Sequence, residues 1–199
     1  MIRLALFAAV CFGSLANAAN MSADPSDYLA KLKQLQAGDV LQLAPGQYVG
    51  GLPVHGLQGT AAQPIIIRGS GPDKTRLLAK AQRNTISIVD SAHVSISDLM
   101  LDGLGFAADA VRAEGHAHWA HHISLTNLLI VNHGANQGYV GISTKCPAWN
   151  WVIRGNRIVG AGTGMYLGNS DGRAPFFAGI IEQNQLIASV GYNLQIKHQ

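Results

Sequence analysis

Four short segments in the second half of the 199-residue chain carry the side chains best suited to chemistry. Each has the pattern of a strand, so its side chains should point in turn into a core and out to solvent. The expected outward residues include arginine, lysine and tyrosine, which suit an acidic sugar chain. Arg or Lys could neutralise a uronate carboxylate and stabilise the enolate formed on proton abstraction, while Tyr or Lys serves as the base. The segments are 110–114, 141–145, 164–168 and 193–197.

Strand alternation sorts the side chains of these segments into rows. The expected inward residues are Val111, Ile142, Met165 and Leu194, then Ala113, Thr144, Leu167 and Ile196. One outward row is Arg112, Ser143, Tyr166 and Gln195, and the other is Glu114, Lys145, Gly168 and Lys197. The candidate catalytic residues are Lys145, Tyr166 and Lys197. The candidate substrate-binding residues are Arg112, Glu114, Ser143 and Gln195, with Asn169, Asp171 and Arg173 from the loop after the third segment. The alternative is a set of ordinary solvated residues, since outward strand positions are usually polar.

A repeated phrase with a central Asp or Asn positions these segments. Asp98, Asn127, Asn156 and Asn184 recur at an almost constant interval along the chain. Asn and Asp tolerate the left-handed conformation and bond nearby backbone, so we expect them at a corner between two strands, stacked as a ladder in register. Catalysis by these side chains is the alternative, and the ladder is favoured.

Three short strands per repeat predict an all-β solenoid whose strands pair with the coils above and below, with coils of about 29 residues. A sandwich would instead show two-residue hairpin turns between its strands. Apolar spacing at Leu29, Leu32 and Leu35 predicts a short N-terminal helix over 24–37, ended by Gly38, which would cap the first coil. No segment of helical period follows residue 37.

Residues 1–18 have the pattern of a secretory signal peptide. Arg3 gives the positive start, 4–12 the apolar core and 16–18 the small-residue cleavage site. The apolar run is too short to span a bilayer, so we expect an exported protein, periplasmic or extracellular, with no membrane insertion after cleavage. We expect residues 19–199 to form the β-helix domain. Cleavage also removes Cys11 and leaves Cys146 without a disulfide partner, most simply as a buried filler.

Composition excludes several classes of protein. The chain is 48% hydrophobic and 13% charged, which is too apolar for disorder. Its net charge of +3 falls by one when Arg3 is removed, and no basic stripe accompanies it, so we expect no nucleic-acid partner.

The run 116–122 contains four histidines and invites a metal interpretation. His122 lies in register with His93 of the preceding repeat, so both should mark the same position of a coil. No Asp or Glu lies among the histidines to complete a site, and we predict no metal ligands here. His118, His121 and His133 could still border a groove.

The repeat Gly-Ile/Met-x-Leu/Thr followed by Ile-x-x-Asn-x-Ile resembles the right-handed parallel β-helix of the pectin-lyase-like superfamily. The phrase Gly38-Asp39-Val40-Leu41-Gln42-Leu43-Ala44-Pro45-Gly46-Gln47-Tyr48 resembles the opening of those proteins. The resemblance covers about residues 24–199 and implies that the outer face of the sheet built from the four segments forms the substrate groove. It also leaves room for a calcium ion, for which no residue is assigned. The lysine, arginine and calcium-binding glutamates of the alginate and chondroitin lyases have no convincing match, and fold alone does not choose an activity.

These observations predict an exported parallel β-helix protein that acts on or binds an acidic polysaccharide, as a lyase or an epimerase. The alternative is a non-catalytic carbohydrate-binding or surface module. Gln199 ends the fourth segment without a terminal cap, which solenoids normally carry. We therefore expect that the sequence is a fragment or that another chain covers this edge.

Overall fold

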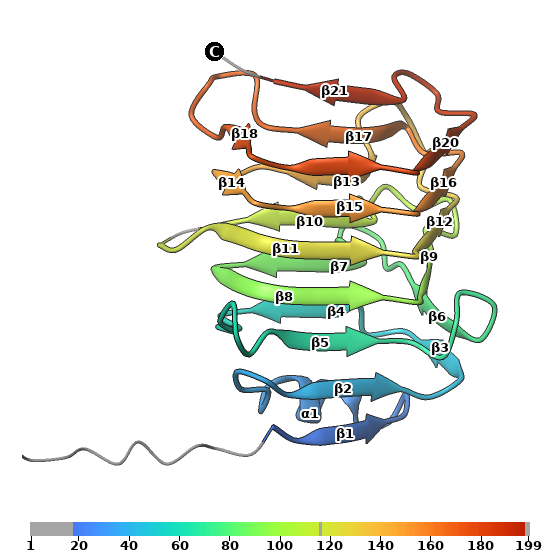
Figure 1. Cartoon of the computed structure of the whole chain (residues 1–199). Helices are drawn as coiled ribbons and strands as arrows, with labels where there is room; N and C mark the ends of the chain where they lie inside the picture. The colour runs from blue at the N-terminus through green and yellow to red at the C-terminus, as the bar shows by residue number, and fades with distance from the viewer. Residues whose placement is uncertain (1–17, 116, 198–199) are drawn as a thin grey trace, which may run out of the picture.

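The chain winds into a right-handed coil of short parallel strands, rising from the N-terminal strand to β21 (Figure 1). The structure is a computed structural model and describes residues 18–115 and 117–197. Its strands form three parallel sheets, because strands of one coil pair with strands of the neighbouring coils. The predicted right-handed parallel β-helix is confirmed.

The three sheets follow one another around each coil. Sheet A contains β1 (Asn20–Ala23), β2 (Val40–Leu43), β5 (Ile65–Arg68), β8 (Ser91–Ser97), β11 (Ala120–Thr126), β14 (Ala148–Trp149), β15 (Val152–Arg154), β18 (Phe176–Phe177) and β19 (Ile180–Glu182). Sheet B contains β3 (Gly46–Tyr48), β6 (Thr75–Leu78), β9 (Met100–Asp102), β12 (Leu129–Val131), β16 (Arg157–Val159) and β20 (Gln185–Ile187). Sheet C contains β4 (Leu52–His55), β7 (Ile86–Val89), β10 (Val111–Glu114), β13 (Val140–Thr144), β17 (Thr163–Leu167) and β21 (Leu194–Ile196).

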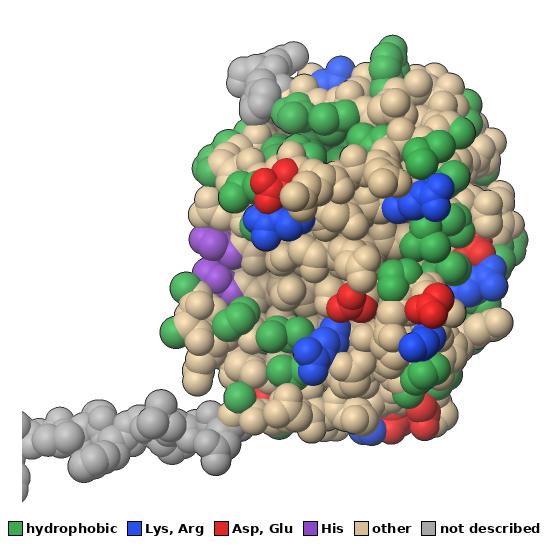
Figure 2. Space-filling view, turned by 45° about the vertical axis from the view of Figure 1, so that its right-hand side comes forward, with side chains coloured by type: hydrophobic (Ala, Val, Ile, Leu, Met, Phe, Trp, Pro, Cys, Tyr) green, Lys and Arg blue, Asp and Glu red, His purple; other side chains and the backbone are tan. Residues whose placement is uncertain are grey.

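Alternate side chains of every sheet meet along the axis of the coil and form one apolar core. In sheet C, Ile86, Val111, Ile142 and Met165 are all fully buried, each stacked on the equivalent residue of the next coil. Each such burial contributes about 1.5–3 kcal/mol relative to exposure. In the last coil the same position is exposed, with Leu194 at 42%. Apolar side chains therefore gather near the C-terminal end, at the top of Figure 2.

The N-terminal helix is shorter than its sequence pattern predicts. Helix α1 spans Tyr28–Leu32, whereas the prediction was 24–37. Tyr28 and Leu32 are buried, and the Tyr28 ring meets the Tyr48 ring edge-on at 4.9 Å between centroids. Strand β1 precedes α1 and pairs with β2, the first strand of the predicted first coil. That edge of the coil is therefore already paired with a strand. The capping role of the helix stays a prediction.

The corner between sheets A and B has an outer and an inner row. The outer row, Asp98, Asn127, Gly155 and Gln183, has positive φ throughout, at 59, 51, 65 and 56°. Strand register places Asn127 opposite Asp98, and Asn127 Nδ2 donates to Asp98 Oδ1 at 2.6 Å. The left-handed corner predicted for Asp98 and Asn127 is therefore confirmed.

The prediction of one continuous four-residue ladder is wrong, because the ladder breaks between Asn127 and Asn156. Thr126 pairs with Arg154, which puts Gly155 opposite Asn127 and Asn156 opposite Leu128. Asn156 thus lies in the inner row, with only 1% of its surface exposed. Its Nδ2 donates to Leu125 O and to Asn184 Oδ1, both at 3.0 Å, and its Oδ1 accepts from Leu128 N at 2.9 Å.

Coil length is nearly constant along sheet A from β5 onward and irregular around sheet C. Val94 pairs with Ile65 and Ile123 pairs with Val94, two steps of equal length along the chain. In sheet C the step from Val111 to its partner Ile142 is long, and the step from Ile142 to its partner Met165 is much shorter. The loops that flank sheet C absorb this difference.

Cys146 is buried and free, as its sequence context predicts. Burial raises the pKa of its thiol to about 12, so it stays protonated at neutral pH. Within residues 18–115 and 117–197 no helix is long and apolar enough to span a membrane. The predicted signal peptide lies outside the described residues except for Ala18.

The buried amide of Asn156 gives a stability prediction. Asn156→Ala leaves the Leu128 N–H and the Leu125 carbonyl without their partner, which should lower the free energy of unfolding by about 1–3 kcal/mol. Urea unfolding followed by circular dichroism measures the change. Asn127→Ala, at the outer row of the same corner, is the matched control and should cost less. An equal loss for the two variants would contradict the inner-row assignment.

Candidate functional site

Sheet C carries the predicted catalytic residues on its outer face, in the rows that strand alternation predicts. The four segments form β10, β13, β17 and β21, and their register pairs Val111 with Ile142, Ile142 with Met165, and Met165 with Leu194. The predicted register is therefore confirmed. The first outward row runs along the solenoid as Pro53, Ser87, Arg112, Ser143, Tyr166 and Gln195.

Lys145, Tyr166 and Lys197 come together on this face. Lys145 Nζ lies over the Tyr166 ring, 3.7 Å from its centroid, and Lys197 Nζ lies 5.9 Å from the same centroid. The two lysines approach one ring because their strands, β13 and β21, lie on either side of β17. An ammonium group near an aromatic face is attracted by the ring quadrupole. The site thus gathers two amino groups and one phenol on one face of the sheet.

The amino group of Lys145 is partly buried. This burial lowers its pKa below the ordinary lysine value, because desolvation disfavours the charged form, and the nearby Arg112 adds to the effect. Tyr166 and Asp109 act in the opposite direction and only partly offset it. A lysine with a lowered pKa has a larger fraction of free amine at neutral pH, which is what a general base requires.

Arg112 is held by two carboxylates. It lies 2.5 Å from Glu114 and 3.5 Å from Asp109, which is buried. Asp109 also accepts hydrogen bonds from Val140 N at 2.8 Å and from Ser143 Oγ at 3.1 Å. Ser143, predicted to contact substrate, is fully buried, so its hydroxyl positions Asp109 instead of facing solvent. The sequence pattern did not indicate Asp109, because this residue lies just before the predicted strand segment.

A hollow of about 440 Å³ opens beside Lys145 and Tyr166. Gln195, a predicted binding residue, lines it together with Gln137, Gly138, Val140 and Thr163. The loop after β17 lies next to it, since the Tyr166 hydroxyl bonds Ser170 Oγ.

The predicted binding residues of that loop hold its shape. Asp171 Oδ1 accepts from Arg173 N at 3.0 Å, and Asn169 O accepts from Gly172 N at 3.1 Å. Asp171 and Arg173 are both exposed, and Asn169 is half-buried. Their contact with substrate stays a prediction.

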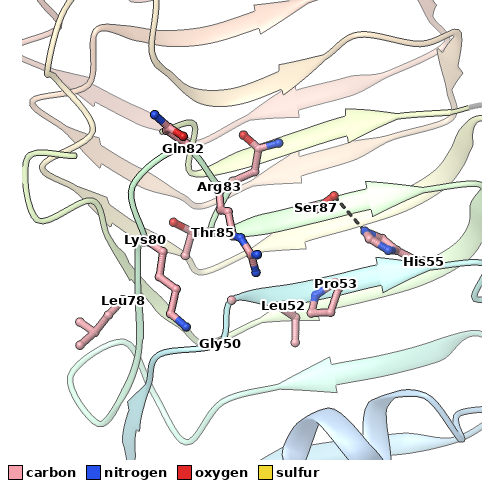
Figure 3. A pocket seen from close by; sticks show the side chains of 12 residues that line it. Gly50, Leu52, Pro53, His55, Leu78, Lys80, Gln82, Arg83, Thr85 and Ser87 are labelled. Carbon is pink, nitrogen blue, oxygen red and sulfur yellow. Dashed lines mark hydrogen bonds between the residues drawn. The ribbon is translucent and has the colours of Figure 1, made fainter. Parts of the chain in front are cut away.

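A second hollow of about 350 Å³ lies over β4 and β7, at the other end of the same sheet (Figure 3). Lys80 and Arg83 line it from the loop that precedes β7, and His55 Nε2 lies 2.9 Å from Ser87 Oγ at its base. Burial lowers the pKa of His55. The sequence pattern did not indicate these residues because the first coils do not carry the repeated phrase that aligned the later ones.

The histidines that could border a groove lie elsewhere. His133 is fully buried, and its Nδ1 lies 2.9 Å from Ala108 O, so the prediction that it borders a groove is wrong. Burial lowers the pKa of its imidazole. His121 belongs to sheet A and His118 to the loop before it, away from the face of sheet C that carries Lys145.

The carboxylates of sheet C do not form a calcium site within the described residues. Asp109 and Glu114 both pair with Arg112, and the described part of the chain brings three potential metal ligands together only at His93, His121 and His122. Calcium prefers several oxygen ligands, and imidazoles do not supply them. We therefore assign no calcium ligands.

Comparison with solved structures reveals the same fold in polysaccharide lyases. An alginate lyase from Paenibacillus sp. str. FPU-7 superposes with a TM-score of 0.65 at 20% identity, over 83% of this chain and 65% of that one. A mannuronic acid-specific polysaccharide family 6 lyase from human gut microbiota gives 0.56 at 17% identity, over 85% and 51%. A PL6 family polysaccharide lyase from Pseudopedobacter saltans gives 0.51 at 12% identity, over 84% and 51%.

This chain has the pectate-lyase-like parallel β-helix fold. It spans about two thirds of the Paenibacillus enzyme and about half of the other two lyases. No family model and no curated protein sequence matches the chain. At these identities the likeness shows the fold, and the chemistry has to be argued from the face of sheet C.

The position of Lys145 gives a second prediction. Its amino group should titrate below the ordinary range of lysine, because burial disfavours the ammonium form. NMR of protein labelled with ¹³C at lysine Cε measures the titration, and the signal absent from Lys145→Arg assigns it. A Lys145 signal that titrates in the ordinary range would show that the amino group is well solvated.

Proposed function

We propose that this chain is an exported polysaccharide lyase that cleaves a uronate-containing chain on the outer face of sheet C. The observation that carries the proposal is the group Lys145, Tyr166 and Lys197, with both amino groups near one tyrosine ring beside an open hollow. The shared fold of the alginate lyases supports it. The predicted signal peptide supports the exported location, periplasmic or extracellular.

The proposed reaction is a β-elimination. A base removes the proton from the ring carbon next to the carboxylate, and the electron pair of that C–H bond forms a carbon–carbon double bond. The glycosidic C–O bond on the adjacent ring carbon breaks, and the departing sugar oxygen takes a proton. The reaction thus needs a base, a positive charge to stabilise the enolate, and an acid.

The three residues divide these roles. Lys145 serves as the base, since burial lowers its pKa and increases its free-amine fraction. Lys197, on the other side of Tyr166, supplies positive charge to the carboxylate as the enolate forms. The Tyr166 hydroxyl, which bonds Ser170 without substrate, donates the proton to the departing oxygen. Arg112 contributes less charge because Asp109 and Glu114 pair with it.

The substrate would lie along the solenoid axis, across the strands of sheet C. The row from Ser87 to Gln195 connects the two hollows, and adjacent strands are about 4.8 Å apart. Lys80 and Arg83 stand at one end of this path and Lys197 at the other. Cations at both ends suit a polymer with a carboxylate on successive sugars.

The proposal predicts new unsaturated sugar ends when the protein is incubated with alginate, pectate or a glycosaminoglycan. These ends absorb in the ultraviolet, so the rate is read directly. Lys145→Met and Tyr166→Phe should each lower kcat/KM by about 100-fold or more, the typical contribution of an acid or base. Lys74→Ala, an exposed lysine in the loop between sheets A and B, is the matched control and should leave the rate unchanged.

Other outcomes of this incubation distinguish an epimerase from a non-catalytic binding module. Epimerisation without new ends, seen by proton NMR of the polymer, would indicate an epimerase, which shares only the proton abstraction. Retention on immobilised polysaccharide without any turnover, unchanged in the Lys145→Met and Tyr166→Phe double variant, would indicate a non-catalytic binding module and overturn the proposal.

A further inference from the structure

Three histidines from two adjacent coils meet on the surface of sheet A, away from the candidate active site. His93 belongs to β8, and His121 and His122 belong to β11. One ring nitrogen from each lies within 4.8 Å of the other two. The Nδ1 atoms of His121 and His122 are 2.8 Å apart, and the His93 and His122 rings stack with centroids 4.2 Å apart. Histidine side chains are visible at the surface about halfway along the solenoid in Figure 2.

The backbone of these two strands explains why the histidines meet. Neighbouring side chains of a strand normally point to opposite faces. His93 and His122 interrupt this alternation because both have φ of 53°, in the left-handed region. His121 and His122 therefore share one side of β11 although they are adjacent in sequence, and their ring centroids lie 5.0 Å apart. Strand pairing of Ala92 with His121 and of Val94 with Ile123 brings His93 next to His122.

We propose that His93, His121 and His122 bind a divalent transition-metal ion, with Zn²⁺ as the reference ion. Neutral imidazole is the usual ligand for Zn²⁺, Cu²⁺ and Ni²⁺, and a site of three histidines leaves one position for water. The proposal replaces the sequence-based prediction of no metal ligands, because three imidazoles suffice without a carboxylate. Zinc–nitrogen bonds of about 2.0–2.1 Å place the ligand atoms of one ion roughly 3.4 Å apart. The nitrogens lie within 4.8 Å of one another, so binding an ion requires side-chain rotations that bring them to that distance.

One contact within the cluster shows which nitrogens an ion could take. The hydrogen bond between the His121 and His122 Nδ1 atoms requires one proton there, and a bound ion would replace that proton.

Two residues of the next coil orient the rings, as outer partners do at metal sites. The His121 ring stacks on Trp149, with centroids 4.4 Å apart and planes 14° apart. Asn150 Nδ2 lies 2.9 Å from His122 Nε2. When His122 binds through Nδ1, its Nε2 carries a proton, and the Asn150 carboxamide can turn its oxygen to accept it.

The position of the site defines its role. It joins β8 to β11 in sheet A, whereas Lys145, Tyr166 and Lys197 lie on sheet C or directly after its strands. A bound ion would cross-link two coils and stabilise the folded chain, because it binds the folded form only. The metal site is independent of the proposed lyase activity.

Zinc titration of the tag-free, chelator-treated protein tests the site. Isothermal calorimetry should show one equivalent of Zn²⁺ bound, and thermal unfolding should shift to higher temperature as Zn²⁺ is added. With Cu²⁺ in place of Zn²⁺, electron paramagnetic resonance should show coupling to imidazole nitrogens. His93→Asn and His122→Asn should abolish the bound equivalent and the thermal shift.

The choice of variants separates loss of binding from loss of fold. Asparagine already occupies the equivalent left-handed position of the next coil, where Asn150 has φ of 55°, so these substitutions fit the backbone. His118→Ala, an exposed histidine in the loop before β11, is the matched control and should keep the bound equivalent. Wild-type protein that binds no more Zn²⁺ than the His93→Asn, His122→Asn double variant would show that the imidazoles are a stacked ladder only, and would overturn the proposal.

Discussion

Backbone pairing between successive coils is the constraint on which the rest of this structure depends. The strands of the described chain pair with strands of neighbouring coils, so the spacing between coils is that of paired strands, about 4.8 Å. This spacing decides which side chains can touch. It stacks the apolar residues of the core, it puts Lys145 and Lys197 on either side of Tyr166, and it brings His93 against His122.

Pairing also explains how much could be read from the sequence. The repeated phrase predicted the solenoid and the register of β10, β13, β17 and β21, because a strand period of two fixes which residues face outward once one is known to be buried. The closeness of Lys145, Tyr166 and Lys197 followed from that register. Side chains supplied by irregular loops did not follow, and Asp109, which accepts from Ser143, comes from such a loop.

Two other features could not be predicted from the sequence pattern, because each depends on the local conformation of the backbone. Asn156 lies as many residues after Asn127 as Asn127 lies after Asp98. The strands of the later coil, however, pair at an interval that is one residue shorter, so Asn156 lies in the inner row. The sequence pattern put His93 and His122 at the same position of a coil but could not show that a left-handed residue brings His121 to the same side. In both cases the local backbone decided which way a side chain points.

The unequal loops around sheet C separate the surface that lines the two hollows from the scaffold of paired strands, two properties that most folds couple. From β5 onward, the strands of sheet A pair at a nearly constant step per coil. The loops before and after sheet C lengthen and shorten without disturbing that pairing, and they carry Lys80, Arg83, Gln137 and Ser170 to the edges of the two hollows. The loops that line the proposed substrate path can therefore change in length while sheet A keeps its register. Insertion or deletion in these loops is thus a natural way to change which polymer the proposed site accepts.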